Sequence, residues 1–173
     1  MRIFLWGMMG SGKTFFLNLL AKNSVRLKLF DLDQIIENSA NKTIAELFSD
    51  NGEEFFRLIE HQTLKKLIDS DDDFVLATGG GTPCFFDNAQ LMKNNGLTIY
   101  LKADPKILAK RLWTEKQKRP LISNFNNIND LEQYLTKLLH QREKFYSQAH
   151  ITWDTQRNPN ELITKIKKFA GCS

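Results

Sequence analysis

The chain has 173 residues and a formal net charge of +4, with 42% hydrophobic and 25% charged residues. This is the composition of an ordinary globular protein with one domain, residues 1–173, and the mild positive charge is compatible with an acidic small molecule as ligand. Two cysteines are too few for a disulfide framework or a four-cysteine zinc site. No stretch approaches the roughly 20 apolar residues of a transmembrane helix, and the apolar run after Arg2 is too short for a signal peptide. We therefore expect a cytoplasmic protein without a membrane partner.

Short apolar runs alternate with helical patterns along the chain, which predicts an α/β fold with a parallel sheet. The N-terminal half is expected to form a strand over 3–6, a helix over 13–22, a strand over 26–30, helices over 33–39 and from Thr43, and a long helix over 52–69. The C-terminal half is expected to form strands over 73–78, 97–101 and 150–153 and helices from Pro105, over 130–147 and over 159–169. Residues 113–128, approximately, lack periodicity, and we expect a mobile lid there.

The first loop carries the clearest motif. Gly7 to Thr14 reads Gly-Met-Met-Gly-Ser-Gly-Lys-Thr, which fits G-x-x-x-x-G-K-[ST] with an apolar strand before it and a helix after it. Its backbone N–H groups and the helix N-terminus favour a bound phosphate. Lys13 would reach the β- and γ-phosphates and the Thr14 hydroxyl would hold Mg²⁺. The alternative is a glycine-rich turn without a ligand, but the sequence context favours a site for a nucleoside triphosphate with Mg²⁺.

Two carboxylates follow the second predicted strand. Asp31 and Asp33 are separated by one residue, so on an extended backbone they point in different directions. One could face Mg²⁺ and the other a substrate hydroxyl. In the alternative interpretation this is a polar strand end at which Asp33 caps the next helix.

Further charged and glycine positions bear on the acceptor of the phosphoryl group. Arg57 and Glu60 are three apart on one helix, so Glu60 could hold the guanidinium as a fork for a carboxylate, or the two could be a surface ion pair. Gly79, Gly80 and Gly81 follow a buried strand, where a ligand could approach the backbone closely, unless they form only a flexible loop.

Two more arginines complete the set of candidates. Arg119 lies in the predicted lid and Arg142 on a later helix. An arginine on a lid can move onto a transferring phosphoryl group and stabilise its charge. Either arginine taken alone would be interpreted as a solvated surface charge.

In combination these motifs resemble the shikimate kinase family, a branch of the P-loop proteins related to nucleoside-monophosphate kinases. The resemblance covers nearly the whole chain. The motifs that carry it, in the order of the family, are Gly7–Thr14, Asp31-Leu32-Asp33, Gly52-Glu53, Phe56-Arg57 with Glu60, Thr78–Gly81, Arg119-Pro120-Leu121, Arg142 and Arg157-Asn158-Pro159.

The resemblance implies a three-layer P-loop fold with a five-stranded parallel sheet of order 2-3-1-4-5, flanked by helices. It implies transfer of the ATP γ-phosphate to the 3-hydroxyl of shikimate. We expect the protein to be a monomer. ATP would contact Gly10, Ser11, Gly12, Lys13, Thr14, Phe15, Arg119 and Arg157. Shikimate would contact Asp33, Arg57, Gly79, Gly80, Gly81 and Arg142.

Within that set the resemblance implies individual roles. Lys13, Asp33 and Arg119 would be catalytic, with Asp33 the base at the acceptor hydroxyl. Glu60 would orient Arg57 without touching the substrate. Thr14 and Asp31 would hold Mg²⁺, Asp31 through water.

Some residues depart from the family pattern, and other functions compete. Phe15-Phe16 and Asn18 replace smaller or basic residues common in the family, and Trp6 directly precedes the loop. A kinase for another small molecule such as gluconate and a non-catalytic nucleotide-binding module are the alternatives. The aromatic pairs Phe15-Phe16, Phe55-Phe56 and Phe85-Phe86 could form a stacking surface for bases, but one ring of each pair can face the core, and packing is the expected role. The basic residues are too dispersed for nucleic-acid binding.

Overall fold

The computed structural model describes residues 1–23, 27–116 and 122–171. Its centre is a sheet of five parallel strands in the order β2-β3-β1-β4-β5, which confirms the predicted topology. The strands are β1 (Arg2–Trp6), β2 (Lys28–Asp31), β3 (Phe74–Ala77), β4 (Leu97–Lys102) and β5 (Ile151–Asp154). They differ from the predicted ranges by one or two residues, and Arg26, predicted in the second strand, lies outside the described residues.

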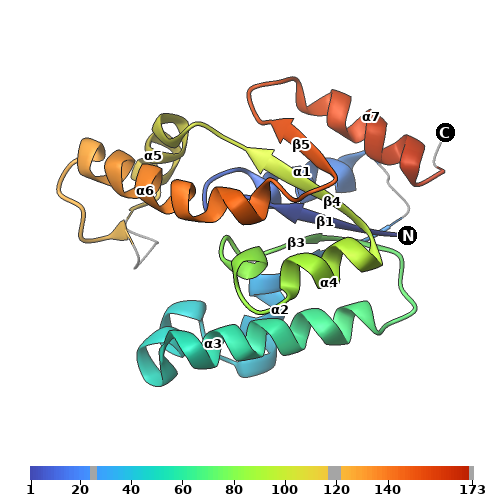
Figure 1. Cartoon of the computed structure of the whole chain (residues 1–173), viewed down its shortest axis with the longest axis horizontal. Coiled ribbons are helices and arrows are strands. Elements are labelled where there is room, and N and C mark those ends of the chain that lie inside the picture. The colour runs from blue at the N-terminus through green and yellow to red at the C-terminus, as the bar shows by residue number, and fades with distance from the viewer. Residues whose placement is uncertain (24–26, 117–121, 172–173) are drawn as a thin grey trace.

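Seven helices surround the sheet in the described ranges (Figure 1). They are α1 (Lys13–Lys22), α2 (Leu32–Ala40), α3 (Ile44–Ile68), α4 (Asn88–Asn95), α5 (Pro105–Thr114), α6 (Ile128–Tyr146) and α7 (Pro159–Phe169). A 3-10 turn, η1 (Thr82–Cys84), precedes α4. Capping residues begin two of these helices: Thr43 forms a capping box with Glu46, and Asp104 accepts from the backbone N–H of Lys106.

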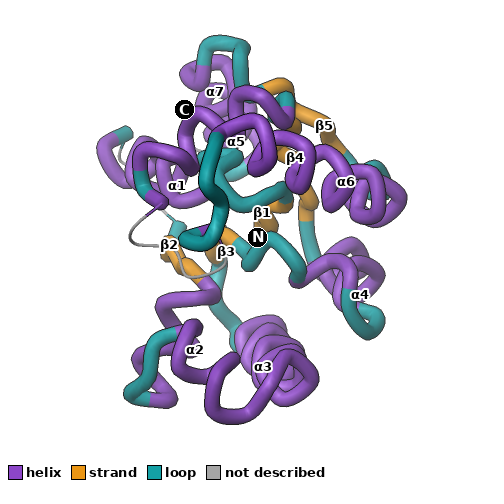
Figure 2. The backbone as a smooth tube through the Cα atoms, turned by 90° about the vertical axis from the view of Figure 1, so that its left-hand side faces the viewer, coloured by secondary structure: helices purple, strands orange, loops and turns teal. Residues whose placement is uncertain are grey.

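The strands alternate their side chains between two buried clusters. Ile3 and Leu5 of β1 face the layer that contains α1 and α7, whereas Phe4 and Trp6 face the layer of α2, α3 and α4. Figure 2 shows the sheet, drawn in orange, between these helical layers. The chain therefore forms the expected three-layer arrangement.

Three details differ from the sequence-based predictions. The helices predicted from Thr43 and over 52–69 form the single element α3, which Gly52 interrupts with a φ of 81° and a ψ of 173°. Neither η1 nor α4 was predicted. The interior side of α4 includes Asn88, so this short helix lacks a continuous apolar stripe.

The predicted lid lies between α5 and α6. These helices end at Thr114 and begin at Ile128, so the connection is shorter than predicted at both ends. Residues 117–121, including Arg119, lie outside the described residues. Among the described helices, none has the length and apolar character that a membrane span requires.

Candidate active site

The P-loop lies at the carboxyl edge of the sheet, between β1 and α1. Lys13 is the first residue of α1, and its Nζ donates to the carbonyl oxygens of Gly7 at 2.7 Å and Met8 at 3.1 Å. These bonds fold the lysine back over the loop. The N-terminus of α1 and the ammonium group thus place positive charge in one location, which suits a phosphate.

Asp31 is the last residue of β2 and Asp33 lies in the first turn of α2, and the two carboxylates make different contacts. Asp31 caps α2, because its Oδ1 accepts from the backbone N–H of Asp33 at 3.1 Å. Its Oδ2 accepts from the Thr14 hydroxyl at 2.8 Å. The alternative in which Asp33 caps this helix is therefore wrong.

The environment of Asp33 alters its acidity. Burial, reinforced by the charges of Asp31 and Glu60, raises the pKa of the Asp33 carboxyl from 3.8 to about 6, although Lys13 acts in the opposite direction. At pH 7 the group is mostly ionised and a stronger base than an ordinary aspartate. A carboxylate with this acidity is suited to accept a proton from a hydroxyl.

A cleft of about 600 Å³ contains both the P-loop and Asp33. Phe15 and Phe16 both line this cleft, but Phe15 is 56% exposed whereas Phe16 is buried, so one ring of this pair packs in the core as expected. Arg111 also lines the cleft and donates to the carbonyl of Gly10 at 3.2 Å.

Arg157 does not line this cleft. Its guanidinium forms an ion pair with Glu161 at 2.5 Å and lies 4.4 Å from the ring centre of Trp153. Its neighbours Thr155 and Pro159 are the lining residues of that segment.

Arg57 and Glu60 form a buried pair, which excludes the interpretation as a surface ion pair. Arg57 is 8% exposed and Glu60 is fully buried. Arg57 Nη1 donates to Glu60 Oε2 at 3.0 Å, and Nε and Nη2 donate to Glu53 Oε1 at 3.2 and 3.0 Å. Phe85 covers the guanidinium, with its ring centre 4.2 Å away. Two carboxylates and an aromatic ring therefore fix the plane of Arg57.

The glycine triplet packs tightly against these charged groups. A Cβ on Gly79 would lie 2.6 Å from Glu60 Oε1, and one on Gly81 would lie 2.6 Å from Arg57 Nη2. Any side chain at either position would displace the buried pair. The triplet is thus a close-approach segment between β3 and η1, and the interpretation as a plain flexible loop is wrong at these two positions.

A second cleft, of about 390 Å³, contains Arg57 and Arg142, and Met9 lines both clefts. Arg142 on α6 lies with Nη1 4.0 Å from Met8 Sδ and near Gly80. Its sequence neighbour Glu143 instead accepts from Tyr100 and Lys102. Within the described residues no carboxylate forms a salt bridge with Arg142, so this cation faces the cleft beside Arg57.

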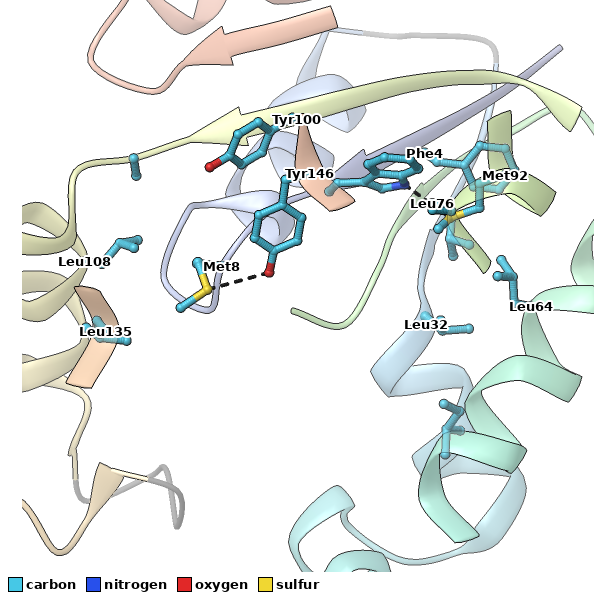
Figure 3. Close-up of a cluster of buried hydrophobic side chains, with 14 of the residues drawn as sticks. Phe4, Met8, Leu32, Leu64, Leu76, Met92, Tyr100, Leu108, Leu135 and Tyr146 are labelled. Atoms are coloured by element: carbon cyan, nitrogen blue, oxygen red, sulfur yellow. Dashed lines mark hydrogen bonds between the residues drawn. The ribbon is translucent and has the colours of Figure 1, made fainter. Parts of the chain in front are cut away.

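Several residues at the site were not identified as site residues from the sequence. Tyr146 donates to the carbonyl of Gly80 and contacts Met8 Sδ, drawn as a dashed line in Figure 3. Neither ring of the pair Phe85-Phe86 is buried in the core as expected: Phe85 is half-buried and lines the second cleft, and Phe86 is exposed. Arg111 was likewise not predicted. Only tertiary packing brings these side chains to the site.

The model of the shikimate kinase family matches residues 9–170. The chain belongs to the shikimate kinase family. It is 42% identical to the shikimate kinase of Azobacteroides pseudotrichonymphae, with 95% of this chain and 96% of that protein aligned. It is 40% identical to the shikimate kinase of Flavobacterium psychrophilum, with 97% and 98% aligned.

Solved structures of shikimate kinases have the same fold. The enzyme from Bacteroides thetaiotaomicron superimposes with a TM-score of 0.89 at 32% identity over 98% of both chains. The enzyme from Acinetobacter baumannii, solved in complex with shikimate, gives 0.84 at 32% identity over 97% of this chain and 91% of that one. These similarities confirm the family and the fold that the motifs indicated.

Proposed function

We propose that the protein transfers the γ-phosphoryl group of ATP to the 3-hydroxyl of shikimate, giving shikimate 3-phosphate and ADP. The observation that carries this proposal is the pair of adjoining clefts. One contains a phosphate-binding loop, the other contains two arginines, and Asp33 lies in the wall of the first. Membership of the shikimate kinase family supports the choice of acceptor.

ATP binds at the P-loop in this proposal. The backbone of Gly10, Ser11 and Gly12 and the Lys13 ammonium would hold the phosphates, with Thr14 and Phe15 completing the segment. Lys13 would exchange its two loop carbonyls for phosphate oxygens. Arg111, already bonded to the loop, would add a further cation at the same cleft.

Two arginines that the resemblance places at ATP remain predictions. Arg119, outside the described residues, would reach ATP from the lid and stabilise the charge of the transferring group. Arg157 would first have to leave Glu161 and Trp153. We retain a nucleotide role for the 155–159 segment through Thr155 and Pro159, which line the cleft.

The residues at the P-loop fit a magnesium ion. Thr14 Oγ1 and Asp31 Oδ2 are hard oxygen ligands 2.8 Å apart at the phosphate end of the cleft, and Mg²⁺ usually takes one or two such protein ligands with phosphate oxygens and waters. Bound there, Mg²⁺ would neutralise charge on the phosphates. We propose that Thr14 and Asp31 hold it together with ATP.

Shikimate would bind in the second cleft. Arg57 and Arg142, which line this cleft, would grip its carboxylate. The ring would extend toward the first cleft, where Gly80 is a lining residue, so that the backbone of Gly79, Gly80 and Gly81 would approach it. Glu60 would keep Arg57 oriented for this contact. Asp33 would accept the proton of the 3-hydroxyl as that oxygen attacks the γ-phosphorus, and positioning would supply most of the catalysis.

We also propose that residues 1–173 act as a single, monomeric kinase domain. The residues that line the ATP cleft extend from Met9, in the loop after β1, to Pro159 at the start of α7, so the site draws on nearly the whole chain. Light scattering of the purified protein, with and without ATP, tests the monomeric state.

The test of function is shikimate-dependent release of ADP from Mg-ATP, with the phosphorylated product identified by mass spectrometry. Gluconate run in parallel distinguishes another small-molecule kinase. Tight ATP binding without turnover of either acceptor would instead indicate a non-catalytic nucleotide-binding module and overturn the proposal.

A further inference from the structure

A chain of buried polar groups extends from Glu60 away from the acceptor cleft. Thr82, the first residue of η1, donates its hydroxyl to Glu60 Oε1 at 2.5 Å. Asn88, at the start of α4, donates from Nδ2 to the carbonyl of Thr82 at 3.0 Å. His61 Nδ1 lies 2.7 Å from Asn88 Oδ1 and ends the chain near the surface. Thr82, Asn88 and Glu60 are all fully buried.

In this series of hydrogen bonds, the two carboxylate oxygens of Glu60 accept from two different elements. Oε2 accepts from Arg57 on the same helix, and Oε1 accepts from Thr82 across the gap to η1. A buried carboxylate without sufficient donors is costly, so the Thr82 hydroxyl determines where Glu60 is stable. The orientation of Glu60 in turn determines where Nη1 of Arg57 lies.

The backbone around Thr82 is itself fixed. Its N–H donates to the carbonyl of Gly79 at 3.2 Å, and Asn88 holds its carbonyl. Gly79 leaves only enough room for the Thr82 and Glu60 oxygens, since a Cβ there would lie within 3.0 Å of both. Thr82 therefore connects the glycine triplet to Glu60 and, through Glu60, to Arg57.

We propose that Thr82 is a positioning residue of the acceptor site: through Glu60 it holds the guanidinium of Arg57 in the orientation that receives the carboxylate of the acceptor. This inference rests on the proposed function for the identity of the acceptor. Thr82 itself does not touch the substrate. Asn88 supports it by fixing the backbone from which the hydroxyl is presented.

Thr82→Val tests the proposal, because valine has the shape of threonine without the hydroxyl. We expect the KM for shikimate to rise about tenfold, the loss typical of a hydrogen bond to a charged group, with the KM for ATP within twofold of wild type. Thr82→Ser retains the hydroxyl and should restore the KM for shikimate. A merely structural role would lower the melting temperature and the fraction of active enzyme but leave both KM values unchanged.

A second measurement does not depend on turnover. In ¹⁵N-labelled protein, the measured signal is the Nη1–H of Arg57, the group that donates to Glu60, assigned by its loss in Arg57→Lys. These protons should exchange slowly with water in wild type and in Thr82→Ser, and at least fivefold faster in Thr82→Val. If Thr82→Val does not fold, Thr82→Ala replaces it in both experiments with the same expected direction.

The outcomes separate this inference from the proposed function. Wild type without shikimate-dependent turnover would overturn the function, while the exchange rate of Arg57 would still test the positioning. An active wild type with an unchanged KM for shikimate and an unchanged Arg57 exchange rate in the variant lacking the hydroxyl would overturn the role of Thr82 alone.

Discussion

The guanidinium carbon of Arg57 lies 4.2 Å from the ring centre of Phe85, which covers the cation at the wall of the acceptor cleft. The next residue, Phe86, is 59% exposed, and its ring contacts the ring of His61 in a tilted arrangement outside that cleft. Two consecutive phenylalanines thus have different surroundings, and they form a natural pair for comparison.

Replacing Phe85 with leucine should weaken acceptor binding. A cation–π contact of this kind contributes about 0.5–2 kcal/mol, so we expect the KM for shikimate to rise about three- to tenfold and the KM for ATP to stay unchanged. Steady-state kinetics with each substrate varied in turn measures both. Phe86→Leu is the matched control and should behave as wild type; equal effects of the two changes would contradict a specific role for Phe85.

Arg142 should bind the carboxylate of the acceptor directly, and not only add to the positive charge around the cleft. Arg142→Lys keeps the cation but loses the planar fork for a carboxylate, so we expect the KM for shikimate to rise at least tenfold with little change in the KM for ATP. Lys144→Ala removes an exposed cation two residues along the same helix. If this control raises the KM for shikimate as much as Arg142→Lys does, the cleft attracts its ligand only by overall charge.

Asp31 should set the demand for magnesium. Asp31→Asn keeps an oxygen that can cap α2 but removes the negative charge beside Thr14. We therefore expect an unchanged melting temperature and a severalfold higher Mg²⁺ concentration at half-maximal activity, measured at saturating ATP. Thr14→Ser retains the hydroxyl and should resemble wild type in this titration. Activity that persists in excess EDTA would rule out the magnesium site altogether.

Asp33→Asn should abolish turnover and stabilise the metal-free protein. The folded protein binds the Asp33 proton more tightly than the unfolded chain does, because the pKa of this carboxyl rises from 3.8 to about 6. Ionisation therefore opposes folding, by up to about 3 kcal/mol at pH 7. This cost is absent below pH 4, grows between pH 4 and 6, and is constant above.

Urea unfolding without Mg²⁺ or nucleotide measures the effect. We expect the free energy of unfolding of Asp33→Asn to be about 1–2 kcal/mol higher than that of wild type at pH 7. This difference should vanish near pH 4. Asp71→Asn, in the exposed turn before β3, should give no such difference. If Asp33→Asn is no more stable than wild type at pH 7, burial does not make ionisation of this carboxyl costly. If the variant has wild-type turnover, Asp33 is not part of the mechanism.

The sequence alone could predict those features whose functional groups are carried by consecutive or nearly consecutive residues. The loop from Gly7 to Thr14 binds phosphate through consecutive backbone groups, so its motif was legible without any knowledge of packing. The strands could be predicted for the same reason, because the apolar run that marks a strand is a local property of the sequence. The caps at Thr43 and Asp104 are also local, since each joins residues at most three positions apart. The strand order came from the family resemblance and not from these local patterns.

Other features depend on packing between distant elements. No local pattern revealed that Phe85 covers Arg57 or that Arg111 reaches the P-loop from α5. The same holds for η1 and α4, whose buried face carries the polar Asn88.

The sequence by itself determined the phosphate-binding loop and the residue types available for binding ATP and the acceptor. Through the order of its motifs it also determined the family. The tertiary structure decided how Arg57 is held and how acidic Asp33 is. Both depend on burial and on charges brought together from different elements: Glu60 from α3 with Thr82 from η1, and Asp31 with Glu60 around Asp33. Desolvation and charge interactions act through space, and only the folded chain sets those distances.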